Sequence, residues 1–500
     1  MRNGDVSFWW HTWGVPQRHP PLPSLPEGTE ADVCIVGGGY TGLWTAYYLK
    51  RADPGLRVVV LEAAFTGFGA SGRNGGWLTA ALPGSRARYA KGPWGKDGVR
   101  ALERALRDTV DEVARVCQAE DIDAGLVKGG TLAVATSPAQ DARLREQLEH
   151  DRAWGDGEDV VTYLDKAELA ARMNVAGAEG ALFSPHCARI QPAALVAGLA
   201  AAAGRAGADI YEATPVTSIA PGRVSTPFGD VRATYVLRCT EGFTGRLPGL
   251  RRTLLPMNSA MIVTEPLSDQ AWADIGWDGY ETLGDEAHAY VYAQRTADGR
   301  IAIGGRGVPY RYASGLDDRG AVAPATVSQL ADVLRRMFPA TRSAKVDHAW
   351  CGVLGVPRDW CAAVHLDKST GLGWAGGYTG HGVAASNLAG RTLADLVRGE
   401  RSDLARGDLA RGERSDLARG ERSDLARGDL ARGDLARGDL ASLPWVGHTS
   451  PRWEPEPLRW TGVHSLYAIY RTADRLEYRN ATPRTSPLAR AADLISGIPH

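Results

Sequence analysis

An apolar run, a glycine-rich turn, a helical pattern and a second apolar run follow one another in residues 31–64, ADVCIVGGGYTGLWTAYYLKRADPGLRVVVLEAA. This order predicts a βαβ unit, which needs a parallel sheet covered by helices. The turn carries Gly37, Gly39 and Gly42, spaced as GxGxxG. The first glycine permits a tight bend, the second lets backbone approach a pyrophosphate, and the third lets the helix pack closely on the strand. The amides at the start of the helix then bind the phosphates.

Glu62 supports a dinucleotide site at this turn. It ends the second apolar run, twenty residues after Gly42. A carboxylate at that place accepts hydrogen bonds from ribose hydroxyls and repels a 2′-phosphate. Tyr40 and Thr41, which open the helix, belong to the same predicted site. The competing interpretation is a glycine turn that serves packing alone.

Two further glycine-rich loops favour FAD over a nicotinamide cofactor. The loop GFGASGRNGGW, residues 67–77, follows Glu62 closely and can form a second backbone cradle for the pyrophosphate and the flavin. The loop GGYTGHG, residues 376–382, opens a late helix. The positive end of that helix can face the flavin and stabilise the negative charge of its reduced form. A nicotinamide cofactor requires neither loop.

Length and composition exclude several classes of protein. Five hundred residues exceed the usual size of a single core, so two or more domains are expected. A net charge of −1 argues against nucleic acid or an anionic membrane as the main partner. No apolar run approaches the roughly 20 residues of a membrane span, and residues 1–21 lack an apolar signal core. The cytoplasm is therefore the expected compartment.

The six cysteines indicate reduced thiols and no metal site. They stand at 34, 117, 187, 239, 351 and 361, without CxxC or short Cys/His spacing. Free thiols are the ordinary state in a cytosolic protein.

At its three glycine motifs the sequence resembles the FAD-dependent oxidoreductases of the D-amino-acid oxidase superfamily, which includes glycine oxidase, sarcosine oxidase and gamma-glutamylputrescine oxidase. The segment GASGRNGG, residues 69–76, is most similar to the gamma-glutamylputrescine oxidase branch. The resemblance runs from about Ala31 to Leu396 and includes RIQPAALVAGLA (189–200) and RIAIGGRG (300–307). One departure is RCTEGF, residues 238–243, where a smaller strand end bearing alanine is usual.

The resemblance implies a fold class: a discontinuous, Rossmann-like α/β domain for FAD, with an inserted α+β substrate domain on a large antiparallel sheet. Segments of the FAD-binding domain are expected at 28–85, 151–248 and 341–397, and substrate-domain segments at 86–150 and 249–340. Residues 1–27, rich in proline, are expected to form an extended arm. Residues 398–441 form a repeat insertion, and residues 442–500 form a tail with an amphipathic helix. One face of that helix carries Leu466, Ile469, Tyr470, Ala473 and Leu476, and we expect it to dock on the body.

The resemblance also implies an activity. The enzyme would oxidise the C–N bond of a small amine or amino acid by hydride transfer to flavin N5. The resulting imine would be hydrolysed, and O2 would be reduced to H2O2. The alternative is a dehydrogenase that passes electrons to a quinone or a carrier protein. Neither the particular substrate nor the oligomeric state, for which a homo-oligomer is possible, follows from the sequence.

Cofactor contacts are carried over position by position. By the resemblance, Gly37, Gly39, Gly42 and Glu62 would bind the ADP portion, and Val216 would meet the adenine through its backbone. The loop residues expected at the pyrophosphate and flavin are Ala70, Ser71, Gly72, Arg73, Asn74 and Gly75. Those expected at the pyrimidine edge of the flavin are Gly377, Gly380, His381 and Gly382.

Four residues are candidates for catalysis. Tyr290 and Tyr292 lie two apart in a predicted strand and so share one face, which would form a lid over the substrate or serve sheet packing only. His381 could polarise flavin or substrate, or act as a turn residue. Cys351 stands at a similar distance before Gly377 as the cysteine that bonds covalently to flavin in sarcosine oxidases. We therefore expect its thiol to touch the flavin, with a covalent bond possible.

Residues 398–441 repeat two related units, RGERSDLA and RGDLA, and contain Arg-Gly-Asp triplets. Units of five and eight residues share no helical, strand or solenoid period, which indicates duplication of a short segment rather than a repeat architecture. The rival interpretation is an adhesion protein on an oxidoreductase scaffold, and no secretion signal accompanies the triplets.

Deletion of residues 427–441 should leave flavin content and turnover unchanged, because extra length in an exposed connector costs little closure entropy. Flavin absorbance per protein and turnover with an amine substrate measure this. A large loss of either would contradict the prediction. Deletion of residues 406–441 tests the adhesion alternative, which loss of cell binding with intact turnover would support.

Overall fold

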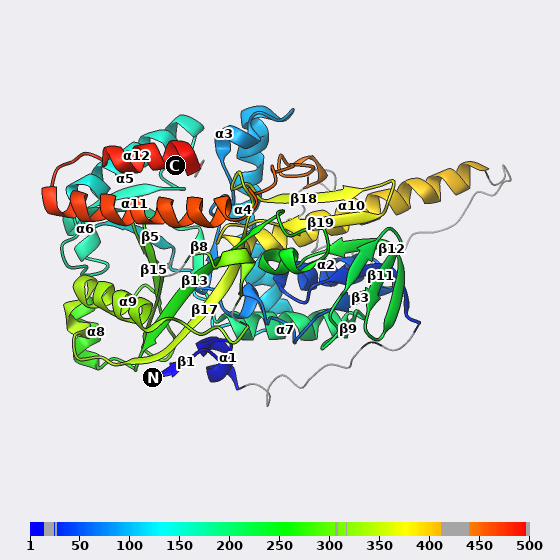
Figure 1. The fold of residues 1–500 in the computed structure, drawn as a ribbon, viewed down its shortest axis with the longest axis horizontal. Helices are drawn as coiled ribbons and strands as arrows, with labels where there is room; N and C mark the ends of the chain where they lie inside the picture. Colours follow the sequence, from blue (N-terminus) through cyan, green and yellow to red (C-terminus); the bar gives the residue numbers. More distant parts are fainter. Residues whose placement is uncertain (15–24, 26–27, 306–308, 317, 412–439, 497–500) are drawn as a thin grey trace, which may run out of the picture.

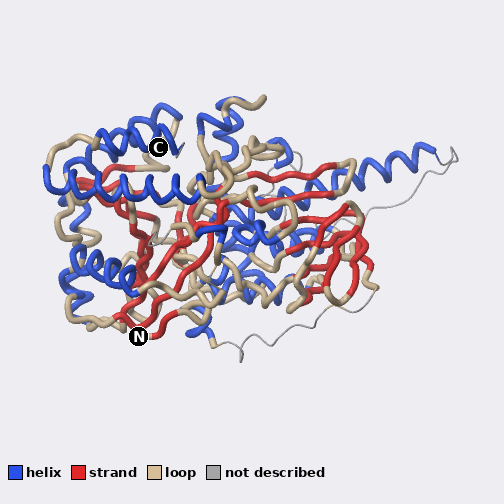
Figure 2. Tube along the Cα trace, viewed as in Figure 1, coloured by secondary structure: helices blue, strands red, loops and turns tan. Residues whose placement is uncertain are grey.

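The computed structural model describes residues 1–14, 25, 28–305, 309–316, 318–411 and 440–496. In these residues two large β-sheets lie beside each other, and helices pack around both (Figures 1 and 2). An eight-stranded sheet contains the predicted βαβ unit, and a nine-stranded sheet is the second one. The expected combination of an α/β part and an α+β part is confirmed.

Parallel strands form the centre of the eight-stranded sheet. β2 (Glu30–Val36) lies between β3 (Val58–Leu61) and β12 (Gly229–Arg238), with parallel pairing on both sides. Val33 on one face and Cys34 on the other are both fully buried. Such strands need continuous apolar runs, which VCIV and VVVL supply. The outer strands are β9 (Asp209–Tyr211), β10 (Ser218–Ala220), β11 (Arg223–Thr226), β18 (Ala363–Asp367) and β19 (Leu372–Gly376).

Helices cover the face of this sheet that carries Val33. α2 (Tyr40–Ala52) packs there, and α10 packs on α2 (Figure 1). Gly390 makes that contact possible, because a Cβ at this position would stand 2.7 Å from the Cβ of Trp44. The helices that complete the layer are α4 (Gly95–Ala119), α7 (Pro192–Arg205) and α10 (Gly382–Arg411).

The nine-stranded sheet has the order β1-β17-β13-β16-β15-β14-β5-β7-β6. Most pairs are antiparallel, as predicted, but β1 with β17 and β14 with β5 are parallel. The sheet is therefore mixed. Its strands are β1 (Arg2–Asn3), β5 (Thr131–Ala135), β6 (Thr162–Asp165), β7 (Gly180–Ser184), β13 (Leu255–Thr264), β14 (Thr282–Asp285), β15 (Val291–Arg295), β16 (Ile301–Gly305) and β17 (Val346–Val356).

Shorter elements complete the body. A two-stranded sheet pairs β4 (Trp77–Thr79) with β8 (Cys187–Arg189). Among the described residues, no helix combines the length and the apolar character that crossing a membrane requires. The remaining helices of the body are α3 (Arg86–Tyr89), α5 (Pro138–Trp154), α6 (Lys166–Ala170), α8 (Asp269–Ile275) and α9 (Pro324–Met337).

The structure divides the chain differently from the predicted segments in two places. The sequence assigns residues 151–248 to the FAD-binding part, but β7 pairs with β5 and β6 pairs with β7, so both strands belong to the nine-stranded sheet. It assigns residues 341–397 to the same part, but β17 pairs with β13. An apolar strand has the same local pattern in either sheet, so partner choice follows from tertiary contacts.

A short helix, α1 (Phe8–Trp13), replaces part of the expected extended arm. The side chain of Ser7 caps it by accepting the Trp10 N–H, and Gly14 ends it with φ 91°. Trp9 is buried, and its ring nitrogen donates to the carbonyl of Asn74 at 2.8 Å. The prolines begin at residue 16, after the helix has ended, so they do not oppose it.

The tail consists of two helices, α11 (Leu458–Asn480) and α12 (Pro487–Ser496). Figure 1 shows them running together across the side of the molecule that holds α5. The predicted apolar stripe packs on α12 through Tyr470 and Ala473, whereas Leu476 is 39% exposed. Val463 and Tyr467, on a neighbouring face, contact the body beside β13 and β17. The docking face is thus adjacent to the predicted one.

The repeat begins inside α10, which continues to Arg411. Residues 412–439 lie outside the described residues, and so do the triplets that begin at 427, 432 and 437. The chain is described again from Leu440.

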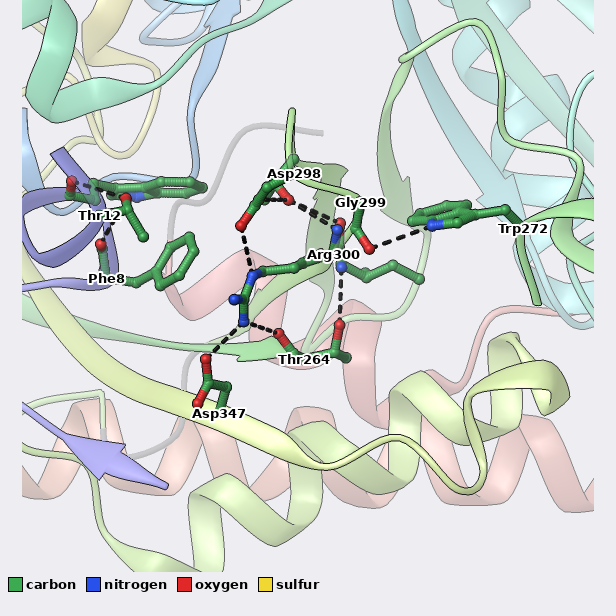
Figure 3. Close-up of polar contacts among 11 residues, drawn as sticks. Phe8, Thr12, Thr264, Trp272, Asp298, Gly299, Arg300 and Asp347 are labelled. Carbon is green, nitrogen blue, oxygen red and sulfur yellow. Dashed lines mark hydrogen bonds and ion pairs between the residues drawn. The ribbon is translucent and has the colours of Figure 1, made fainter. Parts of the chain in front are cut away.

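Arg300 joins three strands of the nine-stranded sheet (Figure 3). Its Nε donates to Asp298 at 2.7 Å, and one terminal nitrogen donates to the Thr264 carbonyl at 3.0 Å and to Asp347 at 2.6 Å. The guanidinium carbon also lies 5.4 Å from the ring centre of Phe8 in α1. The side chain is only 15% exposed, so water screens these contacts only in part.

Replacing Arg300 with Ala should lower the free energy of unfolding by about 1–2 kcal/mol, because a charged donor loses partners on two strands. Denaturant unfolding followed by tryptophan fluorescence measures it. Arg223→Ala is the matched control: its pair with Asp230 is exposed on both sides, and the change should be clearly smaller than that of Arg300→Ala. Equal losses of unfolding free energy in the two variants would show that Arg300 does not hold β13 and β17 together.

Candidate active site

A cavity of about 480 Å³ lies where the carboxyl ends of β2, β3 and β12 meet the loop of residues 63–76. This is the edge of a parallel sheet at which nucleotides bind in doubly wound folds. The volume falls within the roughly 300–1,000 Å³ of small-molecule sites. The predicted cofactor residues that line it are Gly37, Gly39, Tyr40, Thr41, Glu62, Ala70, Ser71, Asn74, Val216, Gly380 and Gly382.

The first glycine turn has no room for side chains. Gly37 has φ +114°, and a Cβ there would stand 2.5 Å from the carbonyl oxygen of Cys239. A Cβ at Gly42 would stand 2.0 Å from the carbonyl oxygen of Gly37. At the start of α2 the N–H of Tyr40 donates to the hydroxyl of Ser71 at 2.8 Å. The turn, the helix start and the second glycine loop therefore meet at one point.

Glu62 and Val216, the residues predicted to meet the ribose and the adenine, both line the cavity. Its carboxylate accepts the N–H of Gly38 at 2.8 Å and of Ala64 at 3.0 Å. Burial raises the pKa of Glu62, and these two backbone donors act against that shift. The carboxylate is thus oriented by backbone before any ligand arrives.

The opposite wall comes from elements far away in sequence. Val353 and Leu354 of β17 line it, together with Val383 and Ser386 of α10. Sequence reasoning missed the two β17 residues, because that strand is apolar along its length and no local signal marks its cavity end. The cofactor cavity is therefore bounded by a strand of the nine-stranded sheet.

Glu241 is one of three charged lining residues, with Arg246 and Asp318, that sequence reasoning missed. It lines the cavity and accepts the N–H of Gly377 at 2.7 Å and of Tyr378 at 3.2 Å. Burial raises the pKa of Glu241 to about 7, although the backbone donors favour its charged form. Its position in RCTEGF, the departure noted above, was the available signal. Glu241 ties the end of β12 to the turn before α10.

Three other predicted cofactor residues, Gly72, Gly75 and Gly377, lie outside the cavity lining and pack against the residues around it. A Cβ at Gly72 would stand 2.1 Å from the ring nitrogen of Trp10, and one at Gly75 would stand 2.8 Å from the ring of Tyr292. Gly377 is held by Glu241. These glycines allow close packing around the loops.

Arg73 is not among the residues that line the cavity. Its guanidinium donates to the carbonyls of Phe68 at 2.7 Å, Asp318 at 3.0 Å and Cys351 at 3.4 Å. It also lies over the ring of Phe68. In this structure Arg73 links the second glycine loop to β17, where the sequence predicts a direct cofactor contact.

The candidate lid tyrosines lie outside the cavity lining. Tyr292 is in β15, its hydroxyl is 2.8 Å from that of Ser259, and its ring meets Trp77 edge-on at 6.2 Å. Because it also contacts Gly75, it stands on the sheet face that meets the cofactor loop. Tyr290 precedes β15 and is 36% exposed.

His381 and Cys351 are likewise not among the lining residues. His381 stands between Gly380 and Gly382, and its N–H donates to the carbonyl of Tyr378 at 2.9 Å. Cys351 is buried in the core of the nine-stranded sheet, with its sulfur 3.6 Å from the carbonyl oxygen of Ala321. It lies two residues before Val353, the lining residue of the same strand.

The cavity fits FAD. The Cβ-free turn at Gly37 admits a pyrophosphate, Glu62 stands where a ribose would lie, and a second loop and a second helix start continue the lining toward β17. A cavity that extends past the first turn to a strand of the second sheet is what a flavin dinucleotide needs. Fold and cavity together define a two-domain flavoprotein oxidoreductase.

The chain belongs to the FAD dependent oxidoreductase (DAO) family, whose model matches residues 32–396. The gamma-glutamylputrescine oxidoreductase of Escherichia coli K12 is 34% identical over 391 residues, which cover 77% of this chain and 87% of the relative. The glycine oxidase of Bacillus licheniformis is 24% identical over 378 residues, 74% of this chain and 93% of the relative. The resemblance inferred from the glycine motifs, and FAD as cofactor, are confirmed.

Solved structures show the same fold. The glycine oxidase from Geobacillus kaustophilus superposes with a TM-score of 0.60 at 24% identity, covering 74% of this chain and 95% of that one. The L-proline dehydrogenase from P. horikoshii gives 0.61 at 18% identity, covering 75% and 94%.

The carboxyl of Glu241 predicts a pH effect on stability. Its folded-state pKa of about 7 lies above the ordinary 4.5, so the folded state holds the proton more tightly than the unfolded state. The resulting stabilisation is complete below pH 4.5 and is lost as pH rises through about 7. Relative to Glu241→Gln, which cannot ionise, the wild type should therefore lose free energy of unfolding between about pH 5 and pH 8.

Denaturant unfolding of both proteins across this range measures the difference. Glu146→Gln, at an exposed position in α5, is the control and should give a profile parallel to the wild type. A parallel profile for Glu241→Gln would contradict the assignment of a raised pKa.

Proposed function

We propose that this protein is an FAD-dependent oxidase that oxidises the C–N bond of a small amine or amino acid and reduces O2 to H2O2. The observation that carries the proposal is the continuity of the cavity, which begins at a dinucleotide turn and ends against the nine-stranded sheet. Family membership supplies amine and amino-acid oxidation as the class of chemistry.

The chain's own residues bind and orient in this proposal. FAD, when bound, supplies the acceptor for a hydride from the carbon next to nitrogen. Gly37, Gly39 and the start of α2 would hold its phosphates, and Glu62 its ribose. Glu241 keeps the turn before α10 in place, and so orients the amides at the start of that helix.

The substrate amine must be neutral to lose a hydride. Burial between the cofactor and the sheet disfavours an ammonium ion, so no strong protein base is required. Tyr292 and Ser259 offer hydroxyls on the sheet face that meets the cofactor loop, and they can orient the amine or a carboxylate. Holding the reacting carbon close to its hydride acceptor supplies most of the remaining rate enhancement.

An anaerobic screen tests the proposal. Purified holoenzyme is mixed with gamma-glutamylputrescine, putrescine, glycine, sarcosine and L-proline, and the flavin absorbance is followed. At least one compound should bleach the flavin, and admitted O2 should restore the colour with one H2O2 per turnover. Gly37→Ala is the control: its Cβ would lie too close to the Cys239 carbonyl, so it should purify without flavin and give no signal.

The outcomes separate the competing functions. Bleaching without peroxide, followed by reduction of a quinone dye, would favour a dehydrogenase. Some relatives are named dehydrogenases. The mitochondrial dimethylglycine dehydrogenase of Mus musculus is 28% identical over 278 residues, which cover 51% of this chain and 30% of the relative. No bleaching by any amine or amino acid would overturn the proposed substrate class.

A further inference from the structure

A cluster of three metal-binding side chains lies where the chain returns to the body after the repeat. Asp359 and Cys361 belong to the loop between β17 and β18, and His448 belongs to the returning segment. One ligand atom from each residue lies within 4.8 Å of the others. The His448 Nε2 and the Asp359 Oδ2 are 2.8 Å apart. Cys361 and His448 stand on opposite sides of the repeat, so no short metal-ligand spacing marks them in the sequence.

The donor set is one that zinc-class metals prefer. Thiolate sulfur, imidazole nitrogen and carboxylate oxygen all bind Zn²⁺, and three protein ligands leave a fourth position for water. Asp359 and Cys361 are buried, whereas the His448 side chain is 20% exposed. The cluster therefore has a buried side that fixes ligands and an exposed side through which a metal and a water can enter.

Surrounding groups already orient these ligands. The other oxygen of Asp359 accepts the Ser450 hydroxyl at 2.6 Å and the Cys361 N–H at 3.3 Å. Hydrogen bonds from such outer groups hold metal ligands in place in known sites. These hydrogen bonds leave one ligand atom of each of the three residues within 4.8 Å of the other two.

A second cluster of similar composition provides a contrast. His288, Asp474 and Glu477 also lie close together. There, however, the Glu477 carboxylate already accepts a hydrogen bond from Arg143 at 2.8 Å and another from the Ser486 N–H at 2.6 Å. Arginine there already supplies the positive charge, and no sulfur is present. In the part of the chain that the structure describes, Asp359 forms its ion pair with His448 and not with an arginine or a lysine.

We propose that Asp359, Cys361 and His448 bind one divalent transition-metal ion of the zinc class, with water as the fourth ligand. Binding exchanges the hydrogen bond between His448 and Asp359 for two bonds to the metal. The proton on the His448 Nε2 moves to Nδ1 or is released, and the thiol proton of Cys361 is released to solvent. No electron is transferred. The site fastens the returning segment, which also pairs with β18 through backbone bonds between Val364 and residues 445–447, to the body.

The test uses the full-length holoenzyme, stripped of metal with EDTA and then titrated with Co²⁺ or Zn²⁺ alone. We expect one metal per chain, a thiolate-to-Co²⁺ charge-transfer band in the near ultraviolet, displacement of Co²⁺ by Zn²⁺, and a higher melting temperature with metal. Cys361→Ser and His448→Gln should each weaken binding by more than the roughly 10–100-fold that loss of an outer-shell partner costs. Cys117→Ser, a buried cysteine in α4, is the matched control and should bind like the wild type.

Flavin content reports folding of each variant. Should a variant fail to fold, the Co²⁺ spectrum of the wild type still decides, because the band requires a thiolate ligand. The proposal is overturned if the wild type binds no stoichiometric metal, if bound Co²⁺ lacks the band, or if folded Cys361→Ser binds like Cys117→Ser. None of these readouts depends on the oxidase activity.

Discussion

The contact between Gly42 in α2 and the Gly37 carbonyl is the constraint on which the rest of the site depends. A single methyl group at position 42 would stand 2.0 Å from that oxygen, so α2 can lie this close to β2 only with glycine there. Once α2 is fixed, α10 packs on it through Gly390. The start of α10 then lines the far side of the cavity. Two helix starts separated by most of the chain thus face one site.

β17 connects this site to the second sheet. It pairs with β13 along nearly its whole length, and its later residues Val353 and Leu354 line the cavity. Arg73 reinforces the junction, because its guanidinium reaches from the second glycine loop to the Cys351 carbonyl. The sheet proposed to hold the substrate is therefore attached rigidly to the loop proposed to hold the flavin. Such attachment is what hydride transfer over a short distance requires.

The ends of the chain strengthen the body. α1 inserts tryptophans against the second glycine loop, and Trp9 donates to the carbonyl of Asn74. The tail helix α11 is held by Glu477, which accepts from Arg143 of α5. On both sides of the repeat the chain is anchored, by α10 before it and by the fully buried Trp445 after it. Variation in the length of the repeat therefore need not move the cavity.

The sequence by itself determined the cofactor half of this protein. GxGxxG, the spaced Glu62 and the two later glycine loops predict FAD, because backbone conformations without side chains have few residue choices and leave a local pattern. Only the tertiary structure decided which sheet β6, β7 and β17 join, that Arg73 bonds to the Cys351 carbonyl of β17, and that Glu241 lines the cavity. It also brought Cys361 to His448 across the repeat. These outcomes depend on contacts between residues far apart in the chain. No local pattern encodes them, because burial and the choice of pairing partner are set only when the whole molecule packs.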